Sequence, residues 1–215
     1  MSDVWAQIAL ALADWYASHG RRPVWRGRAS RYQTAIAEVL LQKTKGGDAE
    51  PVWAQIMSRY PTVSSLAEAT EHELLPLLSP LGLGRQRTKR LLSVAAALTR
   101  GSAVLPGLGP YGSAVVALSQ GEEPNATPVD GNVARVVCRL RGLEFERGEP
   151  RKKPEVKAAV RALMDTRDSA ASQLETVLGL VDLGALVCTP TRPLCRVCPL
   201  STWCVSSLPL HASPR

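Results

Sequence analysis

The sequence lacks any apolar run long enough to span a bilayer, which takes about 20 residues. Even the C-terminal run 177–187 is interrupted by Asp182. A secretory signal peptide is not indicated either, because Asp3 stands where positive charge is expected and Asp14 cuts the apolar stretch short. We therefore expect a soluble cytoplasmic protein with no membrane partner.

The sequence also lacks a pair of alternating strands separated by a turn, which is the pattern of a β-hairpin. Apolar residues recur instead at helical spacing along nearly the whole chain. The helices expected on this basis cover residues 5–19, 32–42, 53–60, 62–66, 70–78, 86–98, 115–118 and 133–140, and helical spacing resumes from residue 155. Thr70 and Glu73 stand in capping-box positions, whereas 124–128 and 143–154 are expected to be loops. The predicted fold class is all-α.

Acidic residues are in deficit. Lys and Arg number 26 against 19 Asp and Glu, which gives a net charge of +7 and a pI near 9.5. This balance suits a polyanionic partner such as nucleic acid, but basic proteins without nucleic-acid ligands are common. Charge alone therefore leaves the partner open.

Disulfides are not expected, since four cysteines crowd near one end of a chain predicted to occupy a reducing compartment. Cys188, Cys195, Cys198 and Cys204 form the spacing C-x6-C-x2-C-x5-C. Zinc sites usually combine two close pairs, and only one is present here. The spacing favours a structural 4Fe–4S cluster and leaves zinc as the alternative. Cys138 stands apart in an apolar helical context and is expected to be an ordinary buried thiol.

An electron carrier would also use such a cysteine loop. The sequence contains no second cluster motif and no flavin or nicotinamide fingerprint. These absences argue against that class of protein.

A glycine-rich hairpin, Leu-Pro-Gly-Leu-Gly at residues 105–109, lies between two helical segments. Gly107 and Gly109 let the backbone turn tightly and approach a ligand, and Leu105 opens the string. Pro110 suits the first turn of the following helix, where exposed N–H groups make a phosphate site. A plain turn between two helices is the alternative.

Several motifs occur together with the hairpin in one order. They are residues 23–26 (PVWR), 37–44 (AEVLLQKT), 82–84 (GLG), 129–136 (VDGNVARV) and the four cysteines. Together, over roughly residues 20–205, they resemble the helix-hairpin-helix DNA glycosylases, the group that includes endonuclease III, MutY and the Mig-type thymine mismatch glycosylases. The resemblance implies a two-lobed fold. Residues 28–126 would form a six-helix barrel lobe, and residues 1–27 and 127–215 a lobe holding a 4Fe–4S cluster.

The resemblance also implies a binding partner and a location in the cell. The partner is double-stranded DNA with a mismatched or damaged base, bound by a monomer associated with the nucleoid.

Two carboxylates carry the expected chemistry. Asp130 precedes the helix 133–140 and, taken alone, suggests a helix cap or an Asp-Gly turn. The resemblance makes it the catalytic aspartate, which stabilises a cationic sugar and orients or deprotonates water. Glu38 lies mid-helix, where a solvated face is the alternative. The resemblance makes it a glutamate that contacts the base.

Other positions follow from the same resemblance. Tyr111 stands where strand-cutting enzymes carry a lysine that forms a Schiff base, so little or no lyase activity is expected. In the Mig-type enzymes a tyrosine here lines the base pocket. Gln42 matches the residue that fills the space left by an extruded base, and Leu83 or Arg85 would wedge the opposite strand. Ordinary helix-end and turn residues are the alternative for these three. Candidate phosphate contacts are Arg87, Lys89, Arg90, Arg135, Arg139 and Arg192.

The substrate base is indicated by departures from MutY. Only 11 residues follow Cys204, so the C-terminal domain with which MutY recognises oxidised guanine is not expected. The turn after Gly84 also lacks the aromatic pair that MutY usually places there. Both favour thymine or uracil opposite guanine, although the string at residues 129–132 looks more like MutY. Pro110 and Gly112 also replace the usual basic residue and threonine of the hairpin.

Three alternatives to a thymine or uracil glycosylase stay open. One is removal of adenine opposite guanine or oxidised guanine. The others are a strand-cutting glycosylase for damaged pyrimidines and a non-catalytic iron–sulphur DNA-binding protein.

Overall fold

A computed structural model of the chain describes residues 2–27, 29–144 and 149–210, and within these ranges it contains helices and no strand. The predicted all-α fold class is confirmed. The chain divides into two compact units, one containing the glycine-rich hairpin and the other the four clustered cysteines. The hairpin unit is Arg22–Ala126, and the cysteine unit joins Met1–Arg21 to Thr127–Arg215. Within the described ranges no helix is long and apolar enough to cross a membrane.

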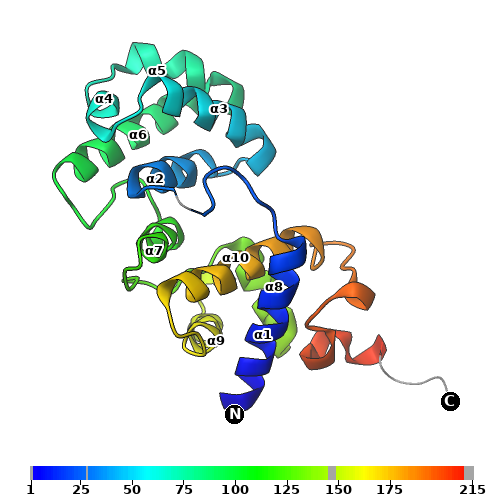
Figure 1. Cartoon of the computed structure of the whole chain (residues 1–215). Coiled ribbons are helices and arrows are strands. Elements are labelled where there is room, and N and C mark those ends of the chain that lie inside the picture. Colours follow the sequence, from blue (N-terminus) through cyan, green and yellow to red (C-terminus); the bar gives the residue numbers. More distant parts are fainter. Residues whose placement is uncertain (1, 28, 145–148, 211–215) are drawn as a thin grey trace. The chain divides into compact units, whose positions relative to one another are not determined.

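The hairpin unit is built around one buried helix (Figure 1). Its helices are α2 (Arg31–Leu40), α3 (Gly46–Arg59), α4 (Val63–Ala67), α5 (Glu71–Leu78), the 3-10 turn η1 (Ser79–Leu81), α6 (Gly84–Thr99) and α7 (Pro110–Ser119). Eight of the ten residues of α2 are buried, because α3, α6 and α7 all pack against it. Its apolar side chains, such as Ile36 and Leu40, join those of the neighbouring helices in a single core.

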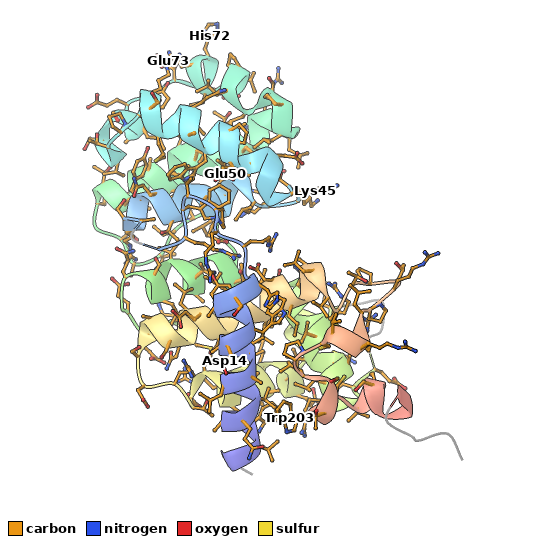
Figure 2. All side chains as sticks on the ribbon, turned by 45° about the vertical axis from the view of Figure 1, so that its right-hand side comes forward. Asp14, Lys45, Glu50, His72, Glu73 and Trp203 are labelled. Carbon is orange, nitrogen blue, oxygen red and sulfur yellow. The ribbon has the colours of Figure 1, made fainter. Side chains whose placement is uncertain are left out.

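Side-chain caps mark the start of α2, α4 and α5. Thr70 Oγ1 accepts a hydrogen bond from the Glu73 backbone N–H, and the Glu73 carboxylate accepts one from the Thr70 backbone N–H, as the sequence predicts. Figure 2 labels Glu73 at the start of α5. The predicted start of the third helix was too late, because α3 begins at Gly46 and takes in Pro51. A proline this early in a helix removes one backbone hydrogen bond, and the helix continues through it.

The cysteine unit packs three helices on α10 (Ala170–Leu186), namely α1 (Ser2–His19), α8 (Gly131–Arg141) and α9 (Pro154–Met164). Its 3-10 segments are η2 (Pro150–Lys152), η3 (Cys195–Val197), η4 (Ser201–Trp203) and η5 (Val205–Leu210). Asp182 on α10 is fully buried and accepts hydrogen bonds from the Arg21 backbone at 2.7 Å and from its guanidinium at 2.6 and 2.9 Å. This ion pair fastens the end of α1 to α10.

Two predicted loops and one predicted buried thiol can be compared with the structure. Residues 124–128 form a loop, as expected. Of the expected excursion 143–154, residues 145–148 lie outside the described residues. Cys138 is completely buried, which confirms its prediction as a core thiol.

Candidate active site

Asp130 is held at the start of α8 in the cysteine unit. It is the N-cap of that helix, as predicted, and its Oδ1 accepts a hydrogen bond from Val133 N at 2.7 Å. Its Oδ2 accepts one from Asn132 Nδ2 at 3.2 Å. Both carboxylate oxygens are therefore fixed in direction. Burial raises the pKa of the Asp130 carboxyl above its ordinary value, although the hydrogen bonds from Val133 and Asn132 act the other way.

Arg135 holds this helix start against α10. Its Nη2 donates to Asn132 Oδ1 and to Gly184 O, both at 2.7 Å, and its Nε donates to Cys188 O at 2.8 Å. Gly184 allows the close approach, since a Cβ there would lie 2.7 Å from the Asn132 Cβ. Arg139 binds the carbonyl oxygens of Thr189 and Pro190 in the same way. Two predicted phosphate contacts, Arg135 and Arg139, thus direct their guanidinium groups to protein carbonyls.

The raised pKa of Asp130 predicts the pH dependence of any reaction that needs its carboxylate. The rate should fall as pH decreases through a pKa higher than that of an ordinary aspartate. Stability should change in the opposite sense. The folded chain holds the proton more tightly than the unfolded chain, so the free energy of unfolding decreases as pH rises between the two pKa values.

Rates and urea midpoints measured against pH, with Asp130→Asn as control, test both trends. The asparagine variant should lose this contribution to the stability trend. An acid limb at the ordinary aspartate pKa would contradict the expectation.

Glu38 lies against the start of α7 in the hairpin unit. It is 9% exposed, so the alternative of a solvated helix face is wrong. A Cβ on Gly112 would lie 3.4 Å from Glu38 Oε2 and 3.5 Å from Glu38 Cβ. Gly112, noted as a departure from the family pattern, therefore packs directly against the Glu38 side chain. Tyr111, the preceding residue, is half-buried.

The hairpin itself depends on Gly107. Its φ of +92° favours glycine, and a Cβ there would lie 3.0 Å from Arg90 Cγ. Leu105 is buried and accepts a hydrogen bond at its carbonyl from Leu108 N at 3.2 Å. Gly109 is the N-cap of α7 and supplies no side chain to cap it, with Pro110 in the first turn as predicted. An uncapped helix start of this kind suits an anion.

The positions predicted to enter the DNA lie beside the hairpin and on the turn before α6. Gln42 Nε2 donates to Gly107 O at 2.8 Å, and its Oε1 accepts from Arg90 Nη1. Leu83 is 50% exposed and has a left-handed backbone, with φ +54°. Arg85 is exposed. Their DNA contacts stay predictions.

The prediction of a phosphate contact is wrong for Arg87. Its side chain is 1% exposed, and it donates hydrogen bonds to backbone carbonyls and to the Thr44 hydroxyl within the hairpin unit. Lys89 and Arg192 are exposed, as phosphate contacts need to be. A signal for burial was present, because Arg87 falls on the same helical face as the buried Leu91 and Val94.

The four predicted cysteine ligands meet around one pocket. Cys188, Cys195, Cys198 and Cys204 all line a space of about 260 Å³, with Arg139 at its wall. None of them forms a disulfide. Burial, together with charge on the other three cysteines, raises the pKa of Cys198 to about 11, although a backbone hydrogen bond at Leu200 acts the other way. Four thiols facing one space fit a cationic centre, which would stabilise them as thiolates.

The arrangement of these four thiols in space indicates whether they fit a single metal ion or a cluster. Within residues 2–27, 29–144 and 149–210, no three His, Cys, Asp or Glu side chains stand close enough to hold a single metal ion. In a 4Fe–4S cluster each cysteine binds a different iron, so the four sulphurs stand apart around a shared space. The donor set and the pocket fit that group.

Comparison with known proteins decides the family. Residues 36–162 match the family model described as HhH-GPD superfamily base excision DNA repair protein. The chain belongs to the HhH-GPD superfamily. This match covers more than half of the sequence and confirms the family predicted from the motifs.

Relatives of this superfamily member include glycosylases of two kinds. The thymine-DNA glycosylase of Aeropyrum pernix is 29% identical over 90% of the chain and 91% of its own length. The thymine/uracil-DNA glycosylase of Pyrobaculum aerophilum is 27% identical over 89% of the chain and 87% of its own length. The adenine DNA glycosylase of Mycobacterium tuberculosis is 33% identical over 90% of the chain and 65% of its own length.

Solved structures share the fold. A thermostable thymine-DNA glycosylase superposes with a TM-score of 0.76 at 21% identity, over 96% of this chain and 98% of that chain. Endonuclease III in a trapped covalent intermediate with DNA superposes with a TM-score of 0.74 at 20% identity, over 98% and 99%. The helical architecture of this HhH-GPD protein is therefore that of the glycosylases.

Proposed function

We propose that the chain is a monofunctional DNA glycosylase that removes thymine or uracil opposite guanine from double-stranded DNA. The coarser activity, a DNA glycosylase of base excision repair, follows from the superfamily and its relatives. The observation that carries the proposal is Asp130, a carboxylate with both oxygens fixed at the start of a helix. The Aeropyrum pernix and Pyrobaculum aerophilum relatives, matched over about nine-tenths of their length, favour thymine and uracil as the bases.

Asp130 supplies the charge that the reaction needs. Breaking an N-glycosidic bond builds positive charge on the sugar, and a fixed carboxylate stabilises that charge without reorganising. The same carboxylate orients or deprotonates the attacking water. Partial burial strengthens its electrostatic effect, because nearby solvent is reduced.

The hairpin unit supplies the groups for the base and the phosphates. Glu38, buried beside Gly112, donates a proton or hydrogen bond to the departing base in its protonated form, or accepts one as a carboxylate. Tyr111 lines the base pocket, and its phenol cannot form the Schiff base that strand cleavage requires. The start of α7 at Gly109 binds the DNA backbone through its N–H groups.

We assign a 4Fe–4S cluster to the pocket of the cysteine unit. Cys188, Cys195, Cys198 and Cys204 would hold it, and it would cross-link a loop that contains only short 3-10 turns between residues 188 and 204. Arg139 supports this loop, since it donates to Cys188 Sγ at 3.3 Å. The chain acts on mismatched DNA as a monomer.

A panel of duplexes tests the proposal. Single-turnover base release should be fast on G:T and G:U pairs and slower by at least about 100-fold on G:A and oxidised-guanine:A pairs, because a pocket built to hydrogen-bond one base rejects another. The sequence at residues 129–132 and the mycobacterial relative keep adenine as the second candidate. Preferential release of adenine would therefore replace the proposed substrate.

A borohydride arm of the same panel separates the strand-cutting alternative. Borohydride should trap no covalent adduct with this chain, because Tyr111 supplies no amine. Endonuclease III, whose trapped intermediate is known, serves as the positive control. A trapped adduct would overturn the monofunctional assignment.

A further inference from the structure

Two residues of the hairpin unit hold a strained backbone. Within the described residues, Lys43 and Leu83 are the non-glycine positions with positive φ, at +57° and +54°. A side chain disfavours this left-handed conformation, which persists only where the surroundings hold it. Lys43 follows Gln42, and Leu83 itself is one of the proposed wedge residues. The strain therefore falls on both segments that the proposed function sends into the DNA.

One guanidinium brackets both strained residues. Arg87 Nη2 donates to Gln42 O at 2.9 Å and to Thr44 Oγ1, the neighbours on either side of Lys43. Its Nε donates to Gly82 O at 3.0 Å, the residue before Leu83. The Arg87 backbone N–H donates to Leu83 O at 3.0 Å.

The chemistry of these bonds requires arginine. Arg87 also donates through Nη1 to Leu40 O at 2.7 Å, at the C-terminal end of α2. The carbonyls at a helix C-terminus carry partial negative charge, which favours a buried cation. Arginine offers five N–H donors in one rigid plane, whereas lysine offers three donors around a single point. Lysine would keep the charge and lose the bridge between the segments.

We propose that Arg87 is a positioning residue for base extrusion. It sets the geometry of segments 42–44 and 82–84, so that Gln42 and Leu83 enter the duplex together, although it is too deeply buried to be a DNA contact itself. This inference rests on the proposed function, in which Gln42 fills the space of the extruded base and Leu83 wedges the opposite strand. Removing the bridge should slow extrusion and leave DNA binding nearly unchanged.

Arg87→Lys in the full chain tests the proposal. The duplex carries 2-aminopurine beside the thymine of one G:T pair, so that stopped-flow fluorescence reports extrusion separately from base release. At saturating enzyme, extrusion and base release should both slow by about 100-fold, the effect of misplacing a group by about 1 Å. The Kd for the duplex should change little, whereas the thermal midpoint should fall, because buried carbonyl oxygens lose hydrogen-bond donors. Arg100→Lys, an exposed arginine at the C-terminal end of α6, is the matched control and should behave as wild type.

A double-mutant cycle separates positioning from general stability. In a Gln42→Ala, Leu83→Ala background, Arg87→Lys should cost no more than about twofold further, because it acts through the two residues already removed. A loss of the same size in both backgrounds would overturn the proposal. So would wild-type extrusion by Arg87→Lys.

Two further outcomes also test the role of Arg87. If Arg87→Lys does not fold, Thr44→Val is used instead, because it removes the hydrogen bond between Arg87 and the Thr44 hydroxyl. Slowed extrusion at an unchanged thermal midpoint would then support the proposal. Unchanged extrusion would overturn it. If the wild type extrudes thymine and releases no base, the proposed function fails while the comparison of extrusion rates still decides the role of Arg87.

Discussion

Asp130→Asn should slow base release by about 1000-fold under single-turnover conditions, because it removes the charge that stabilises the sugar and activates water. Asparagine caps helices as well as aspartate does, so Val133 N keeps its hydrogen-bond partner and α8 keeps its start. Affinity for a G:T duplex, measured by fluorescence anisotropy, should stay within about threefold. Chemistry and folding are thereby separated in one variant.

The choice of substitution matters at this position. Asp130→Ala would also remove the cap, which costs about 1 kcal/mol, and would confound the two effects. Asp48→Asn is the matched control, since Asp48 is an exposed aspartate in the first turn of α3. It should leave the rate unchanged. Base release by Asp130→Asn at the wild-type rate would favour a different catalytic group or a protein with no such reaction.

Cys198→Ala should abolish the brown colour of the purified protein and lower its iron content from about four atoms per chain to near zero. Metal binding is coupled to folding, so the thermal midpoint should fall as well. The loop between Cys188 and Cys204 has only short 3-10 turns, so a cluster held by the four thiols would cross-link it. Visible absorption, iron analysis and calorimetry on one preparation measure all three effects.

Cys138→Ala provides the control for this second prediction. Cys138 is completely buried in α8 and does not line the cysteine pocket. Its substitution should leave a cavity and a modest loss of stability but retain iron and colour. A colourless wild type with one bound zinc, or equal iron loss from both variants, would contradict the cluster assignment.

Local features of the fold and site could be predicted from the sequence. The Thr70–Glu73 capping box and the Asp130 cap follow from short-range hydrogen bonds between residues three apart. Apolar spacing located most helices, because the pattern repeats within each segment. The start of α3 was missed, because Gly46, Gly47 and Pro51 disfavour a helix locally and α3 includes all three.

Long-range polar bonds could not be predicted. Arg87 binds carbonyls and a hydroxyl that lie 43–48 positions earlier in the chain, and Arg135 binds one 53 positions later. A basic side chain in a basic protein reads as a phosphate contact until its partners are known. Only the alignment of Arg87 with Leu91 and Val94 on one face marked it as buried.

One product analysis tests most directly whether the chain releases thymine from DNA without cutting the strand. Wild-type protein is incubated in excess with a duplex holding a single G:T pair, and free base and strand integrity are measured separately. Free thymine, together with an uncut strand carrying an abasic site, is the predicted result. Tight binding to G:T and G:U duplexes with both strands and all bases intact would contradict it.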